Sequence, residues 1–147
     1  MNKLYPYEII NSVYQFDFKK LHAAGINAVI FDIDNTLVEH GAPADKRAVD
    51  FFNKLKKMGL KTCLLSNNKI PRVEPFAEKT GSYYIADAKK PSVKNYLEAM
   101  KLMSSSRRNT AFFGDQIFTD IYGANKSGIR AYLVKPIHPK EEIQIVL

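Results

Sequence analysis

Two aspartates separated by one residue follow directly on a short apolar run, and this pair is where the chain first suggests chemistry. The run is 28–31, and the pair is Asp32 and Asp34. Alternate residues of an extended strand point to the same side, so both carboxylates would face one region. Acids placed so close repel each other unless a cation or a shared proton offsets their charge. The pair favours a hard-metal site with a nucleophile and a proton donor, although Asp-Asn-Thr is also typical of a solvated turn.

Two later segments place polar side chains after the second and third apolar runs. Ser66, Asn67 and Asn68 offer a hydroxyl and two amides that can hydrogen-bond phosphoryl oxygens, and the same residues could simply cap the next helix. Lys89 and Lys90 follow the third run, and a lysine there can offset the charge of a carboxylate and of a phosphate. It could equally be an exposed lysine ahead of a helix that begins with Pro91.

A third segment, Gly114-Asp115-Gln116-Ile117-Phe118-Thr119-Asp120, follows the fourth apolar run. Gly114 lets the backbone turn tightly, and Asp115 would then face Asp32 from a neighbouring strand end. Carboxylate oxygens with water suit Mg²⁺. Asp120 either supports this site or lies in the first turn of the next helix, where an acid favours the helix dipole.

Short apolar runs alternate with helix-length segments, and this pattern predicts how the motifs are positioned. We predict strands at 28–33, 61–65, 83–86, 110–113 and 131–134, and helices at 18–24, 46–58, 71–79, 93–103 and 119–127. Strand and helix in alternation indicate an α/β protein with a parallel sheet and helices on both faces. Such sheets bind ligands at the carboxyl ends of their strands, and every motif above falls just after a strand.

Composition limits the classes of function. The 147 residues are 46% hydrophobic, carry a net charge of +7 and include one cysteine, Cys63, within an apolar run. We expect one domain over 1–147 in the cytoplasm, with a buried thiol and no disulfide framework. The charge favours an anionic partner, but without an arginine-rich tract nucleic acid is not expected. His22, His40 and His138 lack the spacing of zinc ligands.

The motifs together resemble the haloacid dehalogenase superfamily of aspartate-nucleophile phosphatases. The residues that carry the resemblance are, in order, Asp32-Ile33-Asp34-Asn35-Thr36, Ser66, Lys90, and Gly114-Asp115 with Asp120. The match spans about 28–134. It implies a three-layer, Rossmann-like fold with a central parallel sheet of about five strands in the order 3-2-1-4-5. It divides the chain into an N-terminal leader and helix (1–26), a core (27–135) and a C-terminal tail (136–147).

The resemblance also implies a role for each site residue. Asp32 attacks phosphorus and carries an aspartyl-phosphate, while Asp34 protonates the leaving oxygen and then activates water. The phosphoryl group is bound by Ser66, Asn67 and Lys90, where Lys90 is preferred to Lys89 because the family lysine precedes a proline. The implied magnesium ligands are Asp32, the main-chain carbonyl of Asp34, and Asp115, and Asp120 supports them.

The spacing of the motifs narrows the resemblance to one group. The intervals from Asp34 to Ser66 and from Ser66 to Lys90 leave no room for an inserted cap domain, as in the capless subclass IIIA. Within it, the Ser66-Asn67-Asn68 form resembles the phosphatidylglycerophosphate phosphatase family. This implies a lipid phosphate substrate and peripheral contact with an anionic membrane at its inner face. The alternatives are a soluble phosphomonoester (a nucleotide, sugar phosphate or phosphoglycolate) and a non-enzymatic scaffold that binds anions or RNA.

Overall fold

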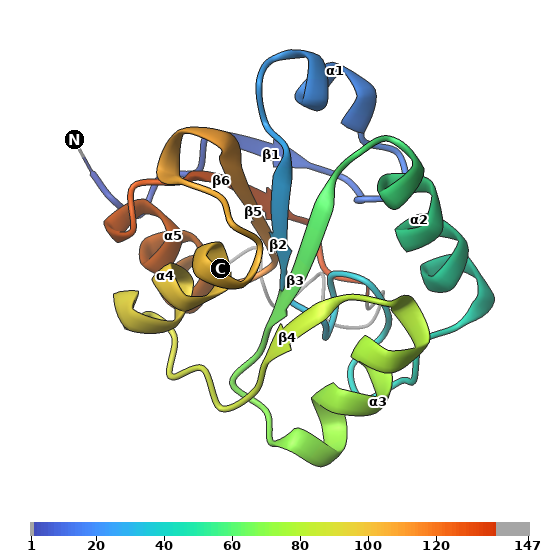
Figure 1. Ribbon diagram of the computed structural model, residues 1–147. Coiled ribbons are helices and arrows are strands. Elements are labelled where there is room, and N and C mark those ends of the chain that lie inside the picture. Colours follow the sequence, from blue (N-terminus) through green and yellow to red (C-terminus); the bar gives the residue numbers. More distant parts are fainter. Residues whose placement is uncertain (1, 138–147) are drawn as a thin grey trace.

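A single parallel sheet between two layers of helices forms the centre of the molecule (Figure 1). The computed structural model describes residues 2–137. The strands are β1 (Glu8–Ile10), β2 (Ala28–Phe31), β3 (Lys61–Leu65), β4 (Tyr83–Ile85), β5 (Thr110–Gly114) and β6 (Arg130–Val134), in the order β1-β6-β5-β2-β3-β4. The predicted order of five strands is confirmed as β4-β3-β2-β5-β6. The sheet has six strands because β1 is added at one edge.

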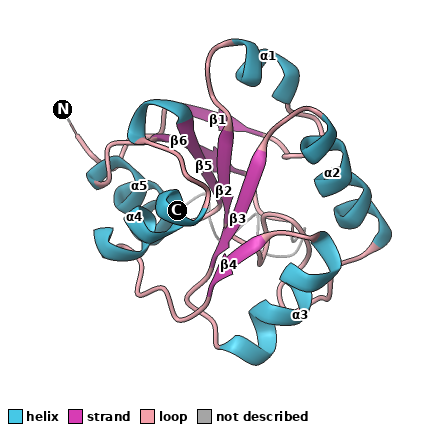
Figure 2. Cartoon of the chain, in the orientation of Figure 1, coloured by secondary structure: helices cyan, strands magenta, loops and turns pink. Residues whose placement is uncertain are grey.

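The helices lie close to their predicted positions (Figure 2). They are α1 (Phe18–Ala23), α2 (Lys46–Lys57), α3 (Ile70–Thr80), α4 (Val93–Leu102) and α5 (Tyr122–Lys126), with a short 3-10 helix, η1 (Arg107–Asn109), before β5. The prediction of one helix over 119–127 is wrong in detail. A π-helical turn, η2 (Ile117–Ile121), precedes α5 and carries one of the site residues.

Strand β1 is not among the predicted strands, because its residues lack the pattern of a buried strand. It has three residues, of which only Ile10 is buried, and it pairs on one side alone, with β6. A strand at the edge of a sheet does not need the continuous apolar run that marks a strand buried on both faces. Glu8 lies opposite Tyr132, so the start of the described chain is hydrogen-bonded to its last strand.

Each face of the sheet has its own hydrophobic core. Val29 and Phe31 of β2 pack with the residues of α1, α2 and α3, while Ile30 packs with α4 and α5. This division follows from the alternation of side chains along a strand. Phe31 is fully buried, and the burial of such a side chain stabilises the fold by about 1.5–3 kcal/mol. The two cores hold the sheet rigidly between the helical layers.

The central strands end level with one another. Phe31 of β2 lies opposite Leu64 of β3 and Phe113 of β5, so the residues that follow these strands meet at one edge of the sheet.

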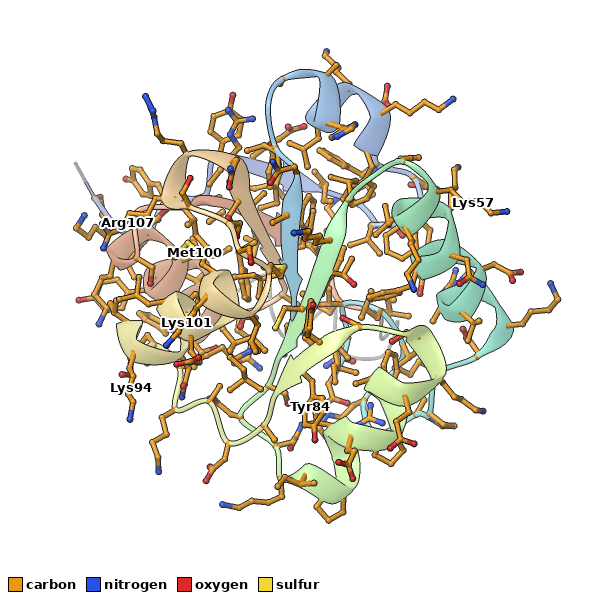
Figure 3. The ribbon with its side chains drawn as sticks, viewed as in Figure 1. Lys57, Tyr84, Lys94, Met100, Lys101 and Arg107 are labelled. Carbon is orange, nitrogen blue, oxygen red and sulfur yellow. The ribbon has the colours of Figure 1, made fainter. Side chains whose placement is uncertain are left out.

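Charged side chains of the helices lie outside this framework. Lys57, Lys94 and Lys101 are exposed and project from the helical layers into solvent (Figure 3). In the described part of the chain, no helix has the length and apolar character needed to cross a membrane.

Candidate active site

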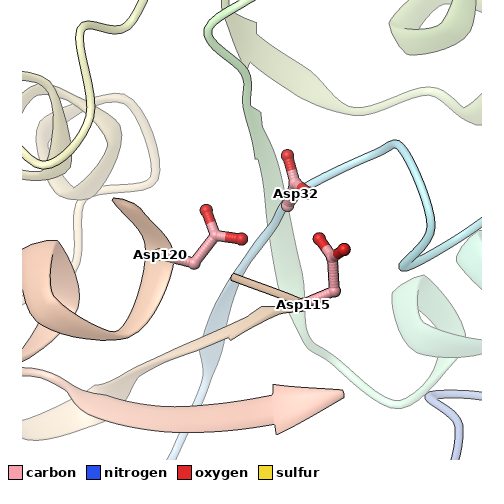
Figure 4. Close-up of side chains that lie close together, drawn as sticks. All are labelled: Asp32, Asp115 and Asp120. Atoms are coloured by element: carbon pink, nitrogen blue, oxygen red, sulfur yellow. The ribbon is translucent and has the colours of Figure 1, made fainter. Parts of the chain in front are cut away.

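Three carboxylates converge at the carboxyl edge of the sheet (Figure 4). Asp32, Asp115 and Asp120 each place an oxygen within 4.8 Å of those of the other two. Asp32 follows β2, and its N–H donates to the Phe113 carbonyl at 3.0 Å, which continues the pairing with β5. Asp115 follows β5 directly, and Asp120 comes from η2. The sequence prediction that Asp115 faces Asp32 agrees with this geometry.

The backbone around Asp120 is shaped to bring its carboxylate under the strand ends. The hydroxyl of Tyr96, on α4, donates to the Thr119 carbonyl at 2.7 Å and anchors the π-helical turn. The Gln116 N–H donates to Asp120 Oδ2 at 3.2 Å. A Cβ at position 114 would lie 2.6 Å from Asp120 Cγ. Only glycine therefore fits at position 114 without displacing Asp120.

Lys90 is the cation bonded to this cluster. Its Nζ lies 3.0 Å from Asp32 Oδ1 and 2.6 Å from Asp120 Oδ1, and the side chain is 4% exposed. Burial by itself disfavours the charged ammonium, but Asp120 and Asp32 outweigh that effect and hold the pKa of Lys90 above its usual value. Asn67 holds the main chain of Lys90 in place, because its Oδ1 accepts a hydrogen bond from the Lys90 backbone N–H at 2.8 Å. Lys90 is thus a permanent positive charge between two acids.

The cluster still carries more negative than positive charge. Burial, together with the Asp32 and Asp120 carboxylates, raises the pKa of Asp115 to about 9. Burial and Asp32 raise the pKa of Asp120 to about 6, although Lys90 acts in the opposite direction. Asp115 Oδ1 is buried and has no hydrogen-bond partner in the described part of the chain. An orphaned carboxylate oxygen beside two further acids fits a hard divalent cation such as Mg²⁺.

Asp34 lies apart from this cluster. Strand β2 ends at Phe31, two residues before its predicted end, and the chain turns at Asn35 with φ +64°. The strand geometry that would place Asp32 and Asp34 side by side therefore stops too early. The carboxylate of Asp34 is instead bonded by three donors at 2.7–2.8 Å: the Gly41 N–H, Asn68 Nδ2 and Arg72 Nη2.

These donors set the charge state of Asp34. Burial would raise its pKa, but the Gly41 N–H and the Arg72 guanidinium, with a smaller contribution from His40, lower it below the usual value. A proton donor to a leaving group needs the opposite shift. In this arrangement Asp34 is an ion-paired carboxylate, and a role as an acid requires the side chain to leave Arg72.

The predicted phosphate-binding loop has internal contacts in the structure. Ser66 is 1% exposed, and its Oγ accepts from the Asn68 N–H at 3.0 Å. The side chain of Asn67 is engaged with the Lys90 main chain. The phosphate contacts predicted for Ser66 and Asn67, and the metal contact predicted for the Asp34 carbonyl, stay predictions.

Two residues of the site were not predicted as such. The sequence predicts Asn68 only as a possible phosphate-binding or capping amide and does not single out Arg72, yet both bind Asp34. The available signal was their position in the loop and first turn after β3, at the same edge of the sheet. Cys63 is buried as predicted, and burial raises the pKa of its thiol to about 12, so it is no nucleophile at neutral pH.

Comparison with known proteins agrees with this fold. Residues 42–128 match the family described as haloacid dehalogenase-like hydrolase. A curated relative, "Probable phosphatase YqeG" of Bacillus subtilis (strain 168), is 34% identical over 133 residues, covering 90% of this chain and 77% of that protein. The chain belongs to the haloacid dehalogenase-like hydrolases and is a phosphatase of that family.

Solved structures show the same fold. A hypothetical protein from Xanthomonas campestris superposes with a TM-score of 0.64 at 15% identity, covering 95% of this chain and 80% of that one. The cobalt-bound deoxy-D-mannose-octulosonate 8-phosphate phosphatase of Haemophilus influenzae gives a TM-score of 0.57 at 17% identity, covering 80% and 81%. At these identities the likeness concerns the fold.

Proposed function

We propose that the protein, as one catalytic domain, hydrolyses a phosphomonoester through an aspartyl-phosphate on Asp32. The observation that carries the proposal is the convergence of Asp32, Asp115 and Asp120 around Lys90 at the carboxyl edge of a parallel sheet. This edge is where such sheets bind ligands. The cluster combines a carboxylate nucleophile, a fixed ammonium and an uncompensated negative charge, which together suit phosphoryl transfer.

In the first half-reaction, an oxygen of Asp32 attacks phosphorus and the bond from phosphorus to the alcohol oxygen breaks. Asp34, turned away from Arg72 and protonated, gives its proton to that oxygen, so a neutral alcohol leaves. Lys90 and Ser66 hold the phosphoryl oxygens during the transfer. A covalent intermediate divides one difficult displacement into two easier ones.

In the second half-reaction, water attacks the phosphorus of the aspartyl-phosphate and the bond to the Asp32 oxygen breaks. Asp34, now a carboxylate, accepts the proton of the attacking water. Inorganic phosphate leaves, and Asp32 returns to its starting state. One residue thus serves as acid and then as base at the same position.

The proposed mechanism includes a metal ion, which would bind at the negatively charged cluster. Asp32, Asp115 and the Asp34 main-chain carbonyl would hold Mg²⁺, with Asp120 acting through its contact with Lys90. Mg²⁺ supplies charge that offsets the repulsion between the Asp32 carboxylate and a phosphate dianion. The orphaned Oδ1 of Asp115 supports this ligand set.

For the substrate we propose phosphatidylglycerophosphate, bound by a capless enzyme at the surface of an anionic membrane. The net charge of +7 supports this choice, because each basic residue near such a surface adds about 1 kcal/mol of attraction. Lys69, Lys89 and Lys94 are exposed on the loops and helix near the site. An uncovered site also suits a substrate held in a surface that itself excludes water.

The nucleophile is tested with Asp32→Asn. The amide cannot attack phosphorus, so we expect hydrolysis to fall below detection while the unfolding temperature stays close to that of the unmodified protein. Brief reaction with a ³²P-labelled substrate and acid quench should label the unmodified protein and leave the variant unlabelled. Activity above a few per cent in a folded variant would remove Asp32 from this role.

The metal and the substrate need separate measurements. Exhaustive chelation should stop hydrolysis, and added Mg²⁺ should restore it; full activity after chelation would refute the metal requirement. Rates on micellar phosphatidylglycerophosphate are then compared with rates on nucleotide, sugar and glycolate phosphates. A preference for a soluble phosphate, together with no binding to anionic vesicles at low salt, would overturn the lipid proposal and leave the phosphatase chemistry intact.

A further inference from the structure

We infer that Arg72, with the cleft beside it, forms a subsite for a second anionic group carried by the alcohol part of the substrate. The inference rests on the proposed function and narrows its substrate class. It assigns the enzyme to phosphomonoesters whose alcohol bears a carboxylate or a phosphodiester, rather than to those with a neutral alcohol.

The first observation is the unused bonding capacity of Arg72. Its Nη2 donates to Asp34 at 2.8 Å, whereas Nε is buried and has no acceptor in the described part of the chain. The side chain is 20% exposed, and its guanidinium carbon lies 5.7 Å from the centre of the Phe76 ring. A partly exposed guanidinium that is bonded to Asp34 at one nitrogen, with a second donor unpartnered among the described residues, is suited to bind an anion.

The second observation is a cleft of about 660 Å³ that Arg72 lines, a size typical of small-ligand sites. It lies between the loop at 41–44 and helix α3. Its walls are mainly apolar, from Pro43, Ala44, Pro71, Pro75 and Phe76, with Glu78 and Lys79 also lining it. An organic group can pack against these walls while its anion meets Arg72.

The third observation fixes which part of the substrate enters the cleft. Arg72 forms an ion pair with Asp34, which is the proposed proton donor to the leaving oxygen. In the proposed function the phosphoryl group binds at Lys90 and Asp32, and neither of these residues lines the cleft. A group that bonds to Arg72 therefore belongs to the alcohol. A phosphodiester would come from a glycerophospholipid, and a carboxylate from a soluble hydroxy acid.

The test compares substrates that differ in this anion alone. With Mg²⁺ present, kcat/KM is measured for 3-phosphoglycerate and for glycerol 3-phosphate, which has a neutral alcohol. Phosphatidylglycerophosphate and its deacylated form are measured in parallel to separate lipid from soluble sources. We expect the unmodified enzyme to prefer the anionic alcohols by about tenfold or more, the usual effect of a hydrogen bond to a charged group. Arg72→Gln should abolish this preference, and Arg72→Lys should restore part of it.

Lys79→Gln is the matched control, because Lys79 lines the same cleft without contacting Asp34. It should keep the preference. Equal losses on both substrate types in Arg72→Gln would show that Arg72 only positions Asp34, and would overturn the inference. An equal loss of preference in Lys79→Gln would show a general effect of charge and would also overturn it. Hydrolysis with no preference in the unmodified enzyme would refute the subsite and leave the proposed function standing.

A binding measurement removes the dependence on turnover. The Nε–H resonance of Arg72 is followed by NMR in separate titrations of the 147-residue protein with glycerate, with glycerophosphoglycerol and with glycerol. Saturable shifts are expected with glycerate or with the phosphodiester, and none with glycerol. If neither anion shifts the resonance, the subsite is refuted. A failure to hydrolyse any phosphomonoester would refute the proposed function instead, and the two results are measured independently.

Discussion

The two aspartates of one motif lie in opposite electrostatic surroundings. Among the described residues, Asp32 and Asp120 share the ammonium of Lys90, and Asp115 lies beside them with a buried oxygen that has no hydrogen-bond partner there. Asp34, two residues on, has a guanidinium, an amide and a backbone N–H. The first group, which we term the acid cluster (Asp32, Asp115, Asp120 and Lys90), carries more negative than positive charge, whereas the charge of Asp34 is neutralised by its partners within the protein.

This difference in charge balance indicates whether each aspartate requires a further cation from solvent. The acid cluster is stable as a set of carboxylates only with a further cation or a retained proton, and so it is prepared for a metal. The Asp34 carboxylate already has hydrogen-bond partners within the protein. A substrate therefore has to displace those partners before it can bond to Asp34. Charge balance thus separates a candidate metal site from a carboxylate that is already paired within the protein.

The largest effect is expected from removal of the ammonium. Lys90→Met should leave two buried acids without their cation and lower the free energy of unfolding by about 3–5 kcal/mol, with kcat reduced about 10³-fold. Chemical denaturation and steady-state rates measure both. Lys69→Met is the matched control, since Lys69 pairs with Asp87 at 3.4 Å with 78% of its side chain exposed, and it should change stability little. Similar losses in the two variants would contradict the comparison.

The next effect concerns Asp115 and the metal. At Mg²⁺ a hundred times its dissociation constant, the unmodified protein should gain about 2.7 kcal/mol, and Asp115→Asn should gain far less. Because burial and its neighbouring acids raise the pKa of Asp115 to about 9, the folded protein holds this proton more tightly than the unfolded chain. The metal-free protein should therefore lose stability as pH rises from about 4 towards 9, and Asp115→Asn should flatten that slope. Thermal unfolding at several pH values decides it.

An intermediate effect is expected at Gly114. A methyl group there overlaps the Asp120 carboxylate, and Gly114→Ala should destabilise the protein by about 1–3 kcal/mol and weaken Mg²⁺ binding. The double variant with Asp120→Ala should recover part of the loss, because the overlapping carboxylate is gone. Strict additivity of the two changes would show that the overlap is not the cause.

The smallest effect on stability should come from Asp34. Its pH dependence is opposite to that of Asp115, because the stability it contributes is lost as pH falls. Burial raises its pKa, but the Gly41 N–H and Arg72 lower it overall, so its contribution is present above the unfolded pKa of about 3.9 and is lost as pH falls through the lower folded value. Asp34→Asn should cost about 1 kcal/mol or less at pH 7, because the pair is partly screened, and its cost should shrink as pH falls below the unfolded pKa. A loss that grows towards acid pH would exclude the ion pair as its source.

The sequence predicts the acid cluster well because its geometry follows from the sheet. Strands of a parallel sheet end at one edge, so residues after β2, β3 and β5 meet whatever the details of the loops. Lys90 and Asp120 are brought in by short connections from neighbouring strands. The alternation of strands and helices predicts both helical layers, whereas the order of five strands follows from the family resemblance.

The remaining features depend on contacts that leave no periodic signal. The bonding of Asp34 to Arg72 depends on a turn at Asn35 and on the path of the loop to Gly41. The π-helical turn at Ile117–Ile121 differs from an α-helix by one residue per turn, and it is held by the Tyr96 hydroxyl from a distant helix. Strand β1 depends on the edge offered by β6 rather than on its own residues.

The pairing of β1 with β6 has a consequence for how the chain is made. Glu8–Ile10 are synthesised before every other strand of the described chain, and their partner, Arg130–Val134, is the last of those strands. During synthesis β1 has no strand to pair with until β6 emerges, and Asp115 can reach Asp32 only after β5 has paired with β2. The nascent protein therefore pairs β1 and brings the acid cluster together only after most of the described chain has emerged.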